Sequence, residues 1–199
     1  MLVQFTLKNF LSFKESATLD MTAINAYKEH QYNLIDLGLK EKFLKVAAIY
    51  GANASGKSNF YLGFQCFQKI IMESFNNVEN NRMTAIEKYY MPYSFQKELG
   101  NTEFEIIFVL DDYEYKYGYE YNEICIVNEW MYRKNLRTNR VVTIFERDQK
   151  QVILGASVRK ECDVYKEQIP NETLVLSFFN KLKLKNDIFS DAYNTIMST

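Results

Sequence analysis

Residues 51–58 decide how this chain is interpreted, and they read Gly51-Ala52-Asn53-Ala54-Ser55-Gly56-Lys57-Ser58. Two glycines stand five positions apart here, in a chain of 199 residues that holds just 7 glycines. The stretch fits G-x-x-x-x-G-K-[ST], the Walker A pattern. The preceding residues 43–50 are mostly apolar without alternation, which predicts a strand buried on both faces.

The residue types in this stretch suit the binding of phosphate groups. Gly51 lets the chain leave a strand through a sharp turn, and Gly56 lets the backbone come close to an anion. Backbone N–H groups then surround the phosphates at the start of the following helix. In such loops the lysine, here Lys57, contacts the β- and γ-phosphates, and the Ser58 hydroxyl ligates Mg²⁺.

The sequence therefore predicts a binding site for ATP with Mg²⁺. Its cofactor-binding residues are Gly51, Ala52, Asn53, Ala54, Ser55, Gly56, Lys57, Ser58 and Asn59, with Ser58 also the metal ligand. The alternative interpretation is a glycine-bearing turn that only joins a strand to a helix.

Residues on both sides of the loop show regular patterns. Downstream, apolar side chains recur at helical spacing and share one face: Phe60, Phe64, Phe67, Ile71 and Phe75. Upstream, residues 2–10 alternate between apolar and polar, which predicts a half-buried strand. Residues 16–21 predict a second strand paired with the first, and residues 25–36 a polar loop with a helical turn.

The rest of the chain predicts an antiparallel meander followed by helices. Short turns separate five expected strands, at residues 103–110, 113–121, 124–132, 141–147 and 151–155. Residues 76–82 predict a polar loop, and helices are expected at residues 172–182 and from Asp187 to Thr199. The predicted fold is mixed α/β: a P-loop sheet core with an antiparallel β-lobe.

Composition excludes several classes of protein. The formal net charge is −1 and the isoelectric point is near 6.0, so no overall basic excess indicates nucleic acid. The single histidine, His30, and three widely spaced cysteines (Cys66, Cys125 and Cys162) argue against metal cages and a disulfide framework. No signal peptide or membrane-spanning run is present, and we expect a soluble cytoplasmic protein with no membrane partner.

One segment resembles a strand that ends in catalytic carboxylates. The apolar residues 106–110 are followed by Asp111 and Asp112, which would hold Mg²⁺ and orient the attacking water in a Walker B strand. The next residues, however, alternate perfectly, with Tyr113, Tyr115, Tyr117, Tyr119 and Tyr121 on one face. We favour a hairpin turn at Asp111 and Asp112, so the catalytic residues are unknown.

Several stretches resemble a known group of ATPases. Residues 9–13 (Asn-Phe-Leu-Ser-Phe), the loop with its flanks at 48–59, and the later residues 91–95, 104–110, 115–120 and 129–132 carry the likeness. They look like the N-terminal half of ABC-type ATPases of the RecF/SMC/OLD group. Most closely they resemble stand-alone bacterial AAA-family ATP-binding proteins of abortive-infection and other phage-defence systems.

This resemblance implies part of an ABC-type head. Residues 1–75 would carry the first strands, the loop and its helix, residues 84–155 the β-lobe, and residues 170–199 the start of a helical part, with the remainder beyond Thr199 or on another polypeptide. Residues 9–13 would lie near the adenine or ribose. Leu11 stands where many relatives carry a basic residue, which Lys14 could replace, and Ala54 replaces a common glycine.

The resemblance also implies a function. Two heads would enclose two nucleotides, so the expected activity is ATP hydrolysis in the complete protein, driving homodimer closure in a defence or DNA-related system. DNA, RNA or an effector protein are further possible partners. The glutamine loop has only weak candidates, in Gln168, Ser177 and Asn180. Two alternatives stay open: a nucleotide sensor that does not hydrolyse, and a P-loop kinase or NTPase unrelated to ABC heads.

Other features have structural interpretations that we favour. The tyrosine stripe at residues 113–121 predicts core packing rather than a base-stacking platform. The basic residues at 133–140 predict a solvated hairpin tip, with contact to a nucleic-acid backbone as the alternative. Lys181, Lys183 and Lys185 predict a helix end, His30 a surface position, and Cys66 a small buried filler.

Overall fold

In a computed structural model of the chain, which describes residues 1–24, 29–38, 41–75, 83–182 and 184–199, seven strands form one antiparallel sheet. The strand order is β2-β1-β5-β6-β7-β8-β9. Its strands are β1 (Leu2–Lys8), β2 (Ala17–Asp20), β5 (Thr102–Leu110), β6 (Tyr113–Tyr121), β7 (Ile126–Asn135), β8 (Val141–Asp148) and β9 (Gln151–Leu154). A short pair, β3 (Leu34–Ile35) and β4 (Phe43–Leu44), lies beyond β2.

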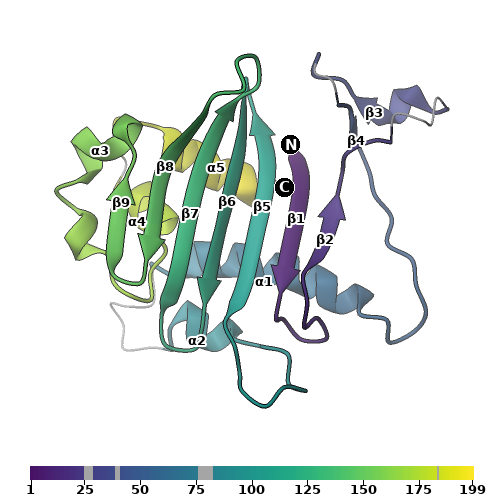
Figure 1. Cartoon of the computed structure of the whole chain (residues 1–199), viewed down its shortest axis with the longest axis horizontal. Helices are drawn as coiled ribbons and strands as arrows, with labels where there is room; N and C mark the ends of the chain where they lie inside the picture. The colour runs from purple at the N-terminus through teal and green to yellow at the C-terminus, as the bar shows by residue number, and fades with distance from the viewer. Residues whose placement is uncertain (25–28, 39–40, 76–82, 183) are drawn as a thin grey trace.

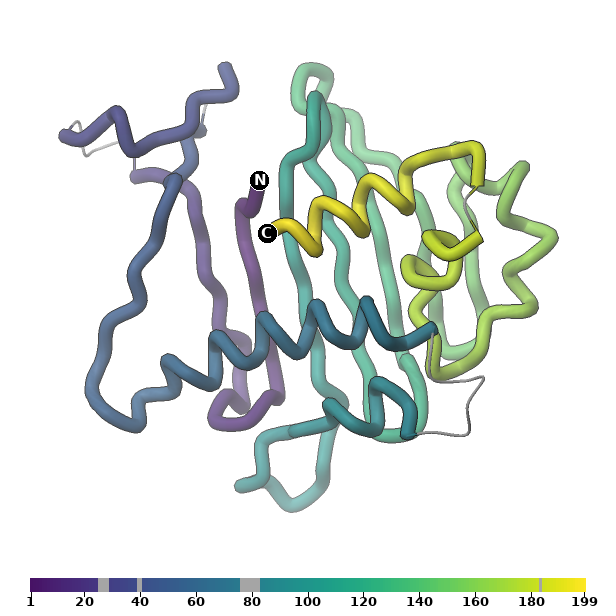
Figure 2. The backbone as a smooth tube through the Cα atoms, turned by 180° about the vertical axis from the view of Figure 1, so that it is seen from behind, coloured from purple at the N-terminus to yellow at the C-terminus, as the bar shows by residue number. Residues whose placement is uncertain are grey.

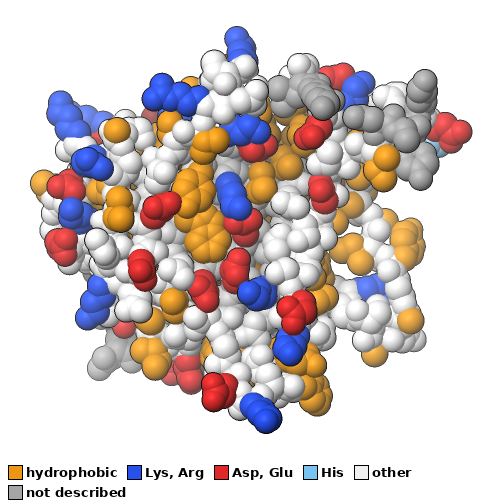
Figure 3. All heavy atoms as spheres, viewed as in Figure 1, with side chains coloured by type: hydrophobic (Ala, Val, Ile, Leu, Met, Phe, Trp, Pro, Cys, Tyr) orange, Lys and Arg blue, Asp and Glu red, His pale blue; other side chains and the backbone are white. Residues whose placement is uncertain are grey.

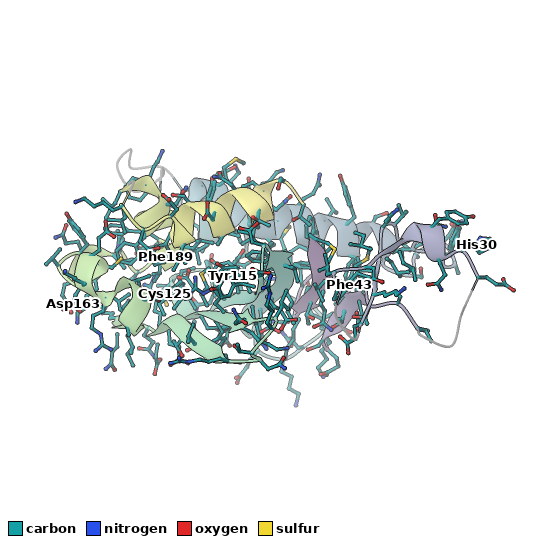
Figure 4. The ribbon with its side chains drawn as sticks, turned by 90° about the horizontal axis from the view of Figure 1, so that it is seen from above. His30, Phe43, Tyr115, Cys125, Asp163 and Phe189 are labelled. Atoms are coloured by element: carbon teal, nitrogen blue, oxygen red, sulfur yellow. The ribbon has the colours of Figure 1, made fainter. Side chains whose placement is uncertain are left out.

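The helices that pack against the hydrophobic core lie on one face of this sheet (Figures 1 and 2). They are α1 (Lys57–Glu73), α2 (Ala85–Tyr89), α3 (Ala156–Cys162), α4 (Val175–Lys181) and α5 (Ile188–Met197). The 3₁₀ turn η1 (Gln31–Asn33) lies beside β3, beyond β2, and the 3₁₀ turn η3 (Lys166–Gln168) follows α3. Seen from above, Phe189 of α5 lies on the helix side of the sheet (Figure 4). Figure 3 shows the opposite face, where charged side chains mix with apolar ones.

Tyrosine alternation on β6 places four rings in the core, as predicted. Tyr115, Tyr117, Tyr119 and Tyr121 are buried beneath the helices. The hydroxyl of Tyr119 donates to the Phe67 carbonyl of α1 at 3.0 Å, so the buried polar atom is satisfied. The alternative interpretation of this stripe as a base-stacking platform is therefore wrong, because these rings are not accessible to a ligand.

The hairpin at Asp111 and Asp112 is confirmed. Leu110 pairs with Tyr113 across the turn, and Asp111 adopts a left-handed conformation with φ of 52°. The Asp112 carboxylate pairs with Arg137 of the neighbouring β7–β8 turn at 3.1 Å. The preceding strand thus returns directly into β6 and does not lead to a loop and helix.

Helix α1 is confirmed and packs through its predicted aromatic face. Phe67 and Ile71 are fully buried, while Phe60, Phe64 and Phe75 are half-buried against the same core. The Phe67 ring stacks on Tyr119 at 5.5 Å with an interplanar angle of 10°. Cys66 is also buried on this helix, as predicted, and burial raises the pKa of its thiol to about 12.

The predicted strand at residues 43–50 is wrong in length and in burial. Only Phe43 and Leu44 form a strand, β4, and from there to Gly51 the chain is exposed and belongs to no helix or strand. The apolar pattern indicated two covered faces, but no described strand lies close enough to bond residues 46–50. The mixed α/β class is confirmed, whereas a parallel P-loop sheet is not present among the described residues.

The remaining elements follow the predictions with local corrections. Strand β2 pairs with β1 and the meander runs from β5 to β9, as expected. The helical turn predicted within residues 25–36 is η1, whereas residues 25–28 lie outside the described part of the chain. The predicted loop at residues 76–82 and Lys183 also lie outside it.

The helices of the second half were predicted less well. Helix α4 begins at Val175, three residues after the predicted start at Glu172. Helix α5 ends at Met197, so the expectation that it continues to Thr199 is wrong. The short helices α2 and α3 were not predicted, because five and seven residues are too few to show a helical period.

A buried carboxylate fixes the start of α4 to the sheet. Glu129 of β7 accepts hydrogen bonds from the backbone N–H of Val175 at 2.7 Å and of Leu176 at 3.1 Å. The hydroxyl of Tyr117 donates to the same carboxylate at 3.0 Å. Burial raises the pKa of Glu129 from 4.5 to about 7, and the charge of Arg147 and the two N–H donors oppose that shift.

The raised pKa makes the stability depend on pH. Because the folded state favours the protonated carboxyl, its contribution is complete below about pH 4.5 and is lost as the pH rises through 7. We expect Glu129 to lower the free energy of unfolding by up to about 3 kcal/mol across this range. Urea denaturation at several pH values measures the slope, which Glu129→Gln should remove.

A matched control is available on the open face of the sheet. Glu103 is half-buried, and burial also raises the pKa of its carboxyl, but it caps no helix. Glu103→Gln should therefore leave most of the slope in place. A Glu129→Gln variant with the original slope would contradict the assignment to Glu129.

Candidate phosphate-binding site

The glycine-rich loop joins the extended residues 45–50 to the N-terminus of α1. Two residues in it have left-handed backbone conformations, Ala54 with φ of 64° and Gly56 with φ of 94°. The N–H of Ser55 donates to the Ala52 carbonyl at 3.3 Å, which closes a tight turn inside the loop. The predicted sequence of loop and helix is therefore present, although the strand before it is not.

A side chain at position 56 would not fit. A Cβ atom built on Gly56 would lie 3.1 Å from the Phe13 ring and 3.1 Å from the Ser12 hydroxyl, and the positive φ would strain any larger residue. The absence of a side chain lets the turn after β1 pack directly on the loop.

Lys57 closes the loop on itself. Its ammonium group donates to the carbonyl oxygens of Gly51 at 2.8 Å and Ala52 at 2.6 Å, and lies 3.4 Å from the Ser55 hydroxyl. These acceptors are exposed parts of the loop, so an anion can exchange for them without opening the core. The amine is thus held over the concave side of the loop, where a phosphate group would lie.

The start of α1 offers free donors to an anion. The first turn of a helix has backbone N–H groups without intrahelical partners, and Gly56 supplies no side-chain cap. The first turn contains no acidic residue, and the positive end of the helix dipole points at the loop. Ser58 is exposed, and its hydroxyl forms no hydrogen bond with any described residue. These features fit a phosphate group with a bound cation.

A pocket of about 250 Å³ lies beside the loop. The loop contributes Ser55, Gly56 and Lys57, and the remaining lining residues are mostly apolar: Phe13, Ala17, Thr18, Leu19, Ile49, Tyr50 and Phe60. No acidic side chain is among the described residues that line it. An apolar pocket next to a phosphate-binding loop is suited to the flat, uncharged part of a nucleotide.

Residues 9–13 divide between the core and the loop. Asn9 lies in a buried network, where its side chain donates to the carbonyls of Gly100 and Asn101, and Phe10 is fully buried. Ser12 and Phe13, in contrast, face Gly56. The predicted proximity to a nucleotide therefore applies to the end of this stretch only.

Asn59 has a structural partner. Its side-chain amide donates to the Ser12 hydroxyl at 2.9 Å, which ties the first turn of α1 to the turn that follows β1. No local pattern predicts this contact, since 47 residues separate the two positions. Leu11 donates its backbone N–H to the Met91 carbonyl, and Lys14 is exposed.

The other candidate residues lie far from the loop. Asp111 and Asp112 follow the end of β5 that pairs with Leu2, whereas the loop packs on the chain beyond Lys8, about 20 Å away along β1. Ser177 donates to the Ile71 carbonyl at the opposite end of α1. Asn180 belongs to the same short helix as Ser177, and Gln168 bonds the Val164 carbonyl. None of them reaches the loop.

Two further predictions concern the surface. Within the basic hairpin tip, Arg137 pairs with Asp112 and Lys134 with Glu114, so carboxylates offset two of its four positive charges, and Arg133 lies over the Tyr113 ring. Figure 4 shows His30 at one outlying end of the molecule, where its ring nitrogen lies 2.8 Å from the Tyr32 hydroxyl. Among the described residues, no group of His, Cys, Asp or Glu side chains could hold a metal ion.

The loop, its lysine and the helix N-terminus together form a candidate anion-binding site with the sequence pattern of a P-loop. The sequence matches the family described as "AAA domain, putative AbiEii toxin, Type IV TA system" over residues 46–176, which is more than half of the chain. The chain belongs to this family of AAA domains, a class of nucleotide-binding ATPases. No curated protein matches the sequence. None of the described helices has both the length and the apolar character needed to cross a bilayer.

Ala54 gives a test of the loop conformation. A left-handed backbone costs a residue with a side chain roughly 1–2 kcal/mol, and glycine avoids this cost. We expect Ala54→Gly to raise the free energy of unfolding by about 0.5–1 kcal/mol, measured by urea denaturation. The control is Ala52→Gly, which should lower it because Ala52 does not have a positive φ. A loss of stability in both variants would contradict the left-handed turn.

Proposed function

We propose that residues 51–59 bind the phosphate groups of ATP together with Mg²⁺. The observation that carries this proposal is the combination at one point of a side-chain-free turn at Gly56, free N–H groups at the start of α1 and the ammonium group of Lys57. The N–H groups and the ammonium group favour an anion, and a triphosphate can engage them together, while Gly56 lets the loop pack on Ser12 and Phe13. Membership of an AAA-domain family supports the same conclusion.

Each residue has a defined task in this proposal. Lys57 exchanges its two backbone acceptors for the β- and γ-phosphate oxygens, so the loop passes from a closed to a ligand-bound state. The free hydroxyl of Ser58 ligates Mg²⁺, and the bound cation neutralises phosphate charge. The apolar pocket formed by Phe13, Leu19 and Ile49 takes the ribose or the base.

Hydrolysis needs groups that the described site does not supply. Water attack on a γ-phosphate requires a residue that orients the water, and no acidic side chain lines the pocket. We therefore propose that hydrolysis takes place in a larger catalytic unit, of which residues 1–199 form the N-terminal, nucleotide-binding part of an ABC-type head. By the RecF/SMC/OLD resemblance, closure of two such heads on ATP would be the output.

The biological setting follows from the family description and the resemblance. A family described by a putative toxin of a type IV toxin–antitoxin system is consistent with a role in defence, and we propose a defence or DNA-related system. Because no acidic side chain lines the pocket, a second candidate function is a sensor that binds the nucleotide without hydrolysing it. Measurement of steady-state phosphate release distinguishes the ATPase from the sensor. It is made on the catalytic unit with all its subunits and segments present.

Lys57→Ala tests the binding site. Removal of a charged hydrogen-bond donor should weaken ATP binding by roughly 10- to 100-fold, because the phosphates lose a charged partner. Isothermal titration calorimetry with Mg²⁺ and ATP measures the change. Lys69→Ala is the matched control, since Lys69 is exposed on the same helix about 18 Å further along. Equal affinity of Lys57→Ala and the original protein would refute the assignment.

Ser58→Ala tests the cation site separately. The original protein should bind ATP more tightly with Mg²⁺ than with EDTA, and the variant should lose most of this difference while keeping its affinity in EDTA. The same titration, repeated in both buffers, gives the comparison. A variant that keeps the full Mg²⁺ effect would show that Ser58 does not ligate the cation.

A further inference from the structure

The turn between β1 and β2 is closed by its own backbone. The N–H of Phe10 donates to the Phe13 carbonyl, and the N–H of Phe13 donates to the Phe10 carbonyl, both at 2.9 Å. Leu11, inside this turn, has a left-handed conformation with φ of 47°. Because the reciprocal bonds restrict the backbone of so short a turn, a contact that holds Ser12 in place also holds Phe13.

A polar side-chain contact joins this turn to the start of α1 (Figure 2). The side-chain amide of Asn59, in the first turn of the helix, donates to the Ser12 hydroxyl at 2.9 Å. Phe13 meets the same helix turn through an apolar contact with the ring of Phe60. Apolar contacts have no preferred direction, whereas a hydrogen bond requires a defined geometry. The bond between Asn59 and Ser12 therefore orients the turn on the helix.

Phe13 lines the apolar pocket beside the loop, together with Phe60. The two rings meet edge to face, with centroids 6.0 Å apart and an interplanar angle of 79°. On its other side, the Phe13 ring lies 3.1 Å from the position that a Cβ atom on Gly56 would take. A shift of the turn would therefore change the width of the pocket, whereas Lys57 and the N–H groups of α1 belong to the helix and would keep their places.

We propose that Asn59 is a positioning residue that acts through Ser12: its hydrogen bond holds the turn so that Phe13 forms one side of the pocket for the nucleoside part of ATP. This inference rests on the proposed binding of ATP and deepens it, because it assigns the nucleoside and the phosphate groups to different parts of the site. Asn59 thus contributes to binding by residues 51–59 indirectly, while Lys57 contacts the phosphate groups.

Two ligands separate these two kinds of recognition. ATP carries a nucleoside and phosphate groups, whereas inorganic tripolyphosphate carries phosphate groups alone. With Mg²⁺ present, Asn59→Ala should weaken ATP binding by about 3- to 10-fold, the net effect of one hydrogen bond, and leave the binding of tripolyphosphate unchanged. Isothermal titration calorimetry measures both affinities. Equal losses for the two ligands, or an unchanged affinity for ATP, would overturn the proposal.

Gln68→Ala is the matched control for Asn59→Ala. Gln68 also lies on α1, about 14 Å beyond Asn59 along the helix axis, and its side-chain amide donates to the Ile196 carbonyl at 2.8 Å. The control deletes the same type of hydrogen bond at a distance from the turn, so both affinities should be kept. If Gln68→Ala lost as much ATP affinity as Asn59→Ala, the effect would come from a general loosening of α1, and the positioning role would be refuted.

Ser12→Ala identifies the group through which Asn59 acts. Because either substitution removes the same hydrogen bond, Ser12→Ala should show the same loss of ATP affinity, and the double variant should lose no more than each single variant. Losses that add in the double variant would contradict the assignment. Ser12 is exposed and Asn59 is half-buried, so the variants should keep the circular dichroism of the original protein.

Hydrogen exchange without any ligand tests the positioning by itself. The amides of Phe10 and Phe13 close the turn, and Asn59→Ala should increase their exchange rates because the turn opens more often. Gln68→Ala should leave these two rates as they are in the original protein. Exchange at Phe10 and Phe13 that does not respond to Asn59→Ala would overturn the proposal whatever the nucleotide affinities are.

The outcomes are distinguishable from those of the phosphate proposal. Lys57→Ala should weaken the binding of both ATP and tripolyphosphate, whereas Asn59→Ala should weaken that of ATP alone. If Lys57→Ala keeps both affinities, the phosphate assignment fails, and the selective loss in Asn59→Ala still decides the positioning role. If Asn59→Ala keeps its ATP affinity while Lys57→Ala loses both, the positioning role fails and the phosphate site stands.

Discussion

The packing of α1 on the sheet is the constraint on which the site depends. Phe67 stacks on Tyr119 and the Phe67 carbonyl accepts the Tyr119 hydroxyl, so a single residue of the helix is held by both an apolar and a polar contact. Because the middle of the helix is fixed, its first turn is fixed too, beside Ser12 and Phe13. The donors at the helix start are therefore positioned before any ligand binds, which lowers the cost of ordering them.

The loop itself can change its contacts when a ligand binds. Residues 51–55 and Ser58 are exposed, and Lys57 is held by two carbonyls of the same loop rather than by the core. Glu129 and Arg147, in contrast, are buried and hydrogen-bonded to the segment that begins α4. The buried charges of Glu129 and Arg147 thus have fixed partners inside the fold. The charge of Lys57, which would contact a ligand, has partners that a ligand can replace.

Local sequence patterns predicted the elements whose buried face is encoded within the element. They failed where a contact with a residue far along the chain determines the local structure. The alternation of Tyr113 to Tyr121 and the spacing of Phe60, Phe64 and Phe67 each identify one buried face, so β6 and α1 follow directly. The contact of Asn59 with Ser12 and the capping of α4 by Glu129 join positions 47 and 46 residues apart, which no local pattern encodes. Residues 46–50 show the opposite error, because their apolar pattern predicted burial while no described residue covers them.

That error concerns the segment that leads into the candidate phosphate-binding loop. A strand that enters a phosphate-binding loop determines where Gly51 lies, and a strand without neighbours determines it poorly. Pairing of residues 46–50 with another strand would restrict the backbone that leads into the loop, so part of the ordering cost would be met by the protein contact and not by the nucleotide. By linkage, a nucleotide that prefers the ordered loop would in turn favour the pairing. Residues 46–50 and the candidate anion site adjoin along the chain, so a contact that ordered one of them would alter the other.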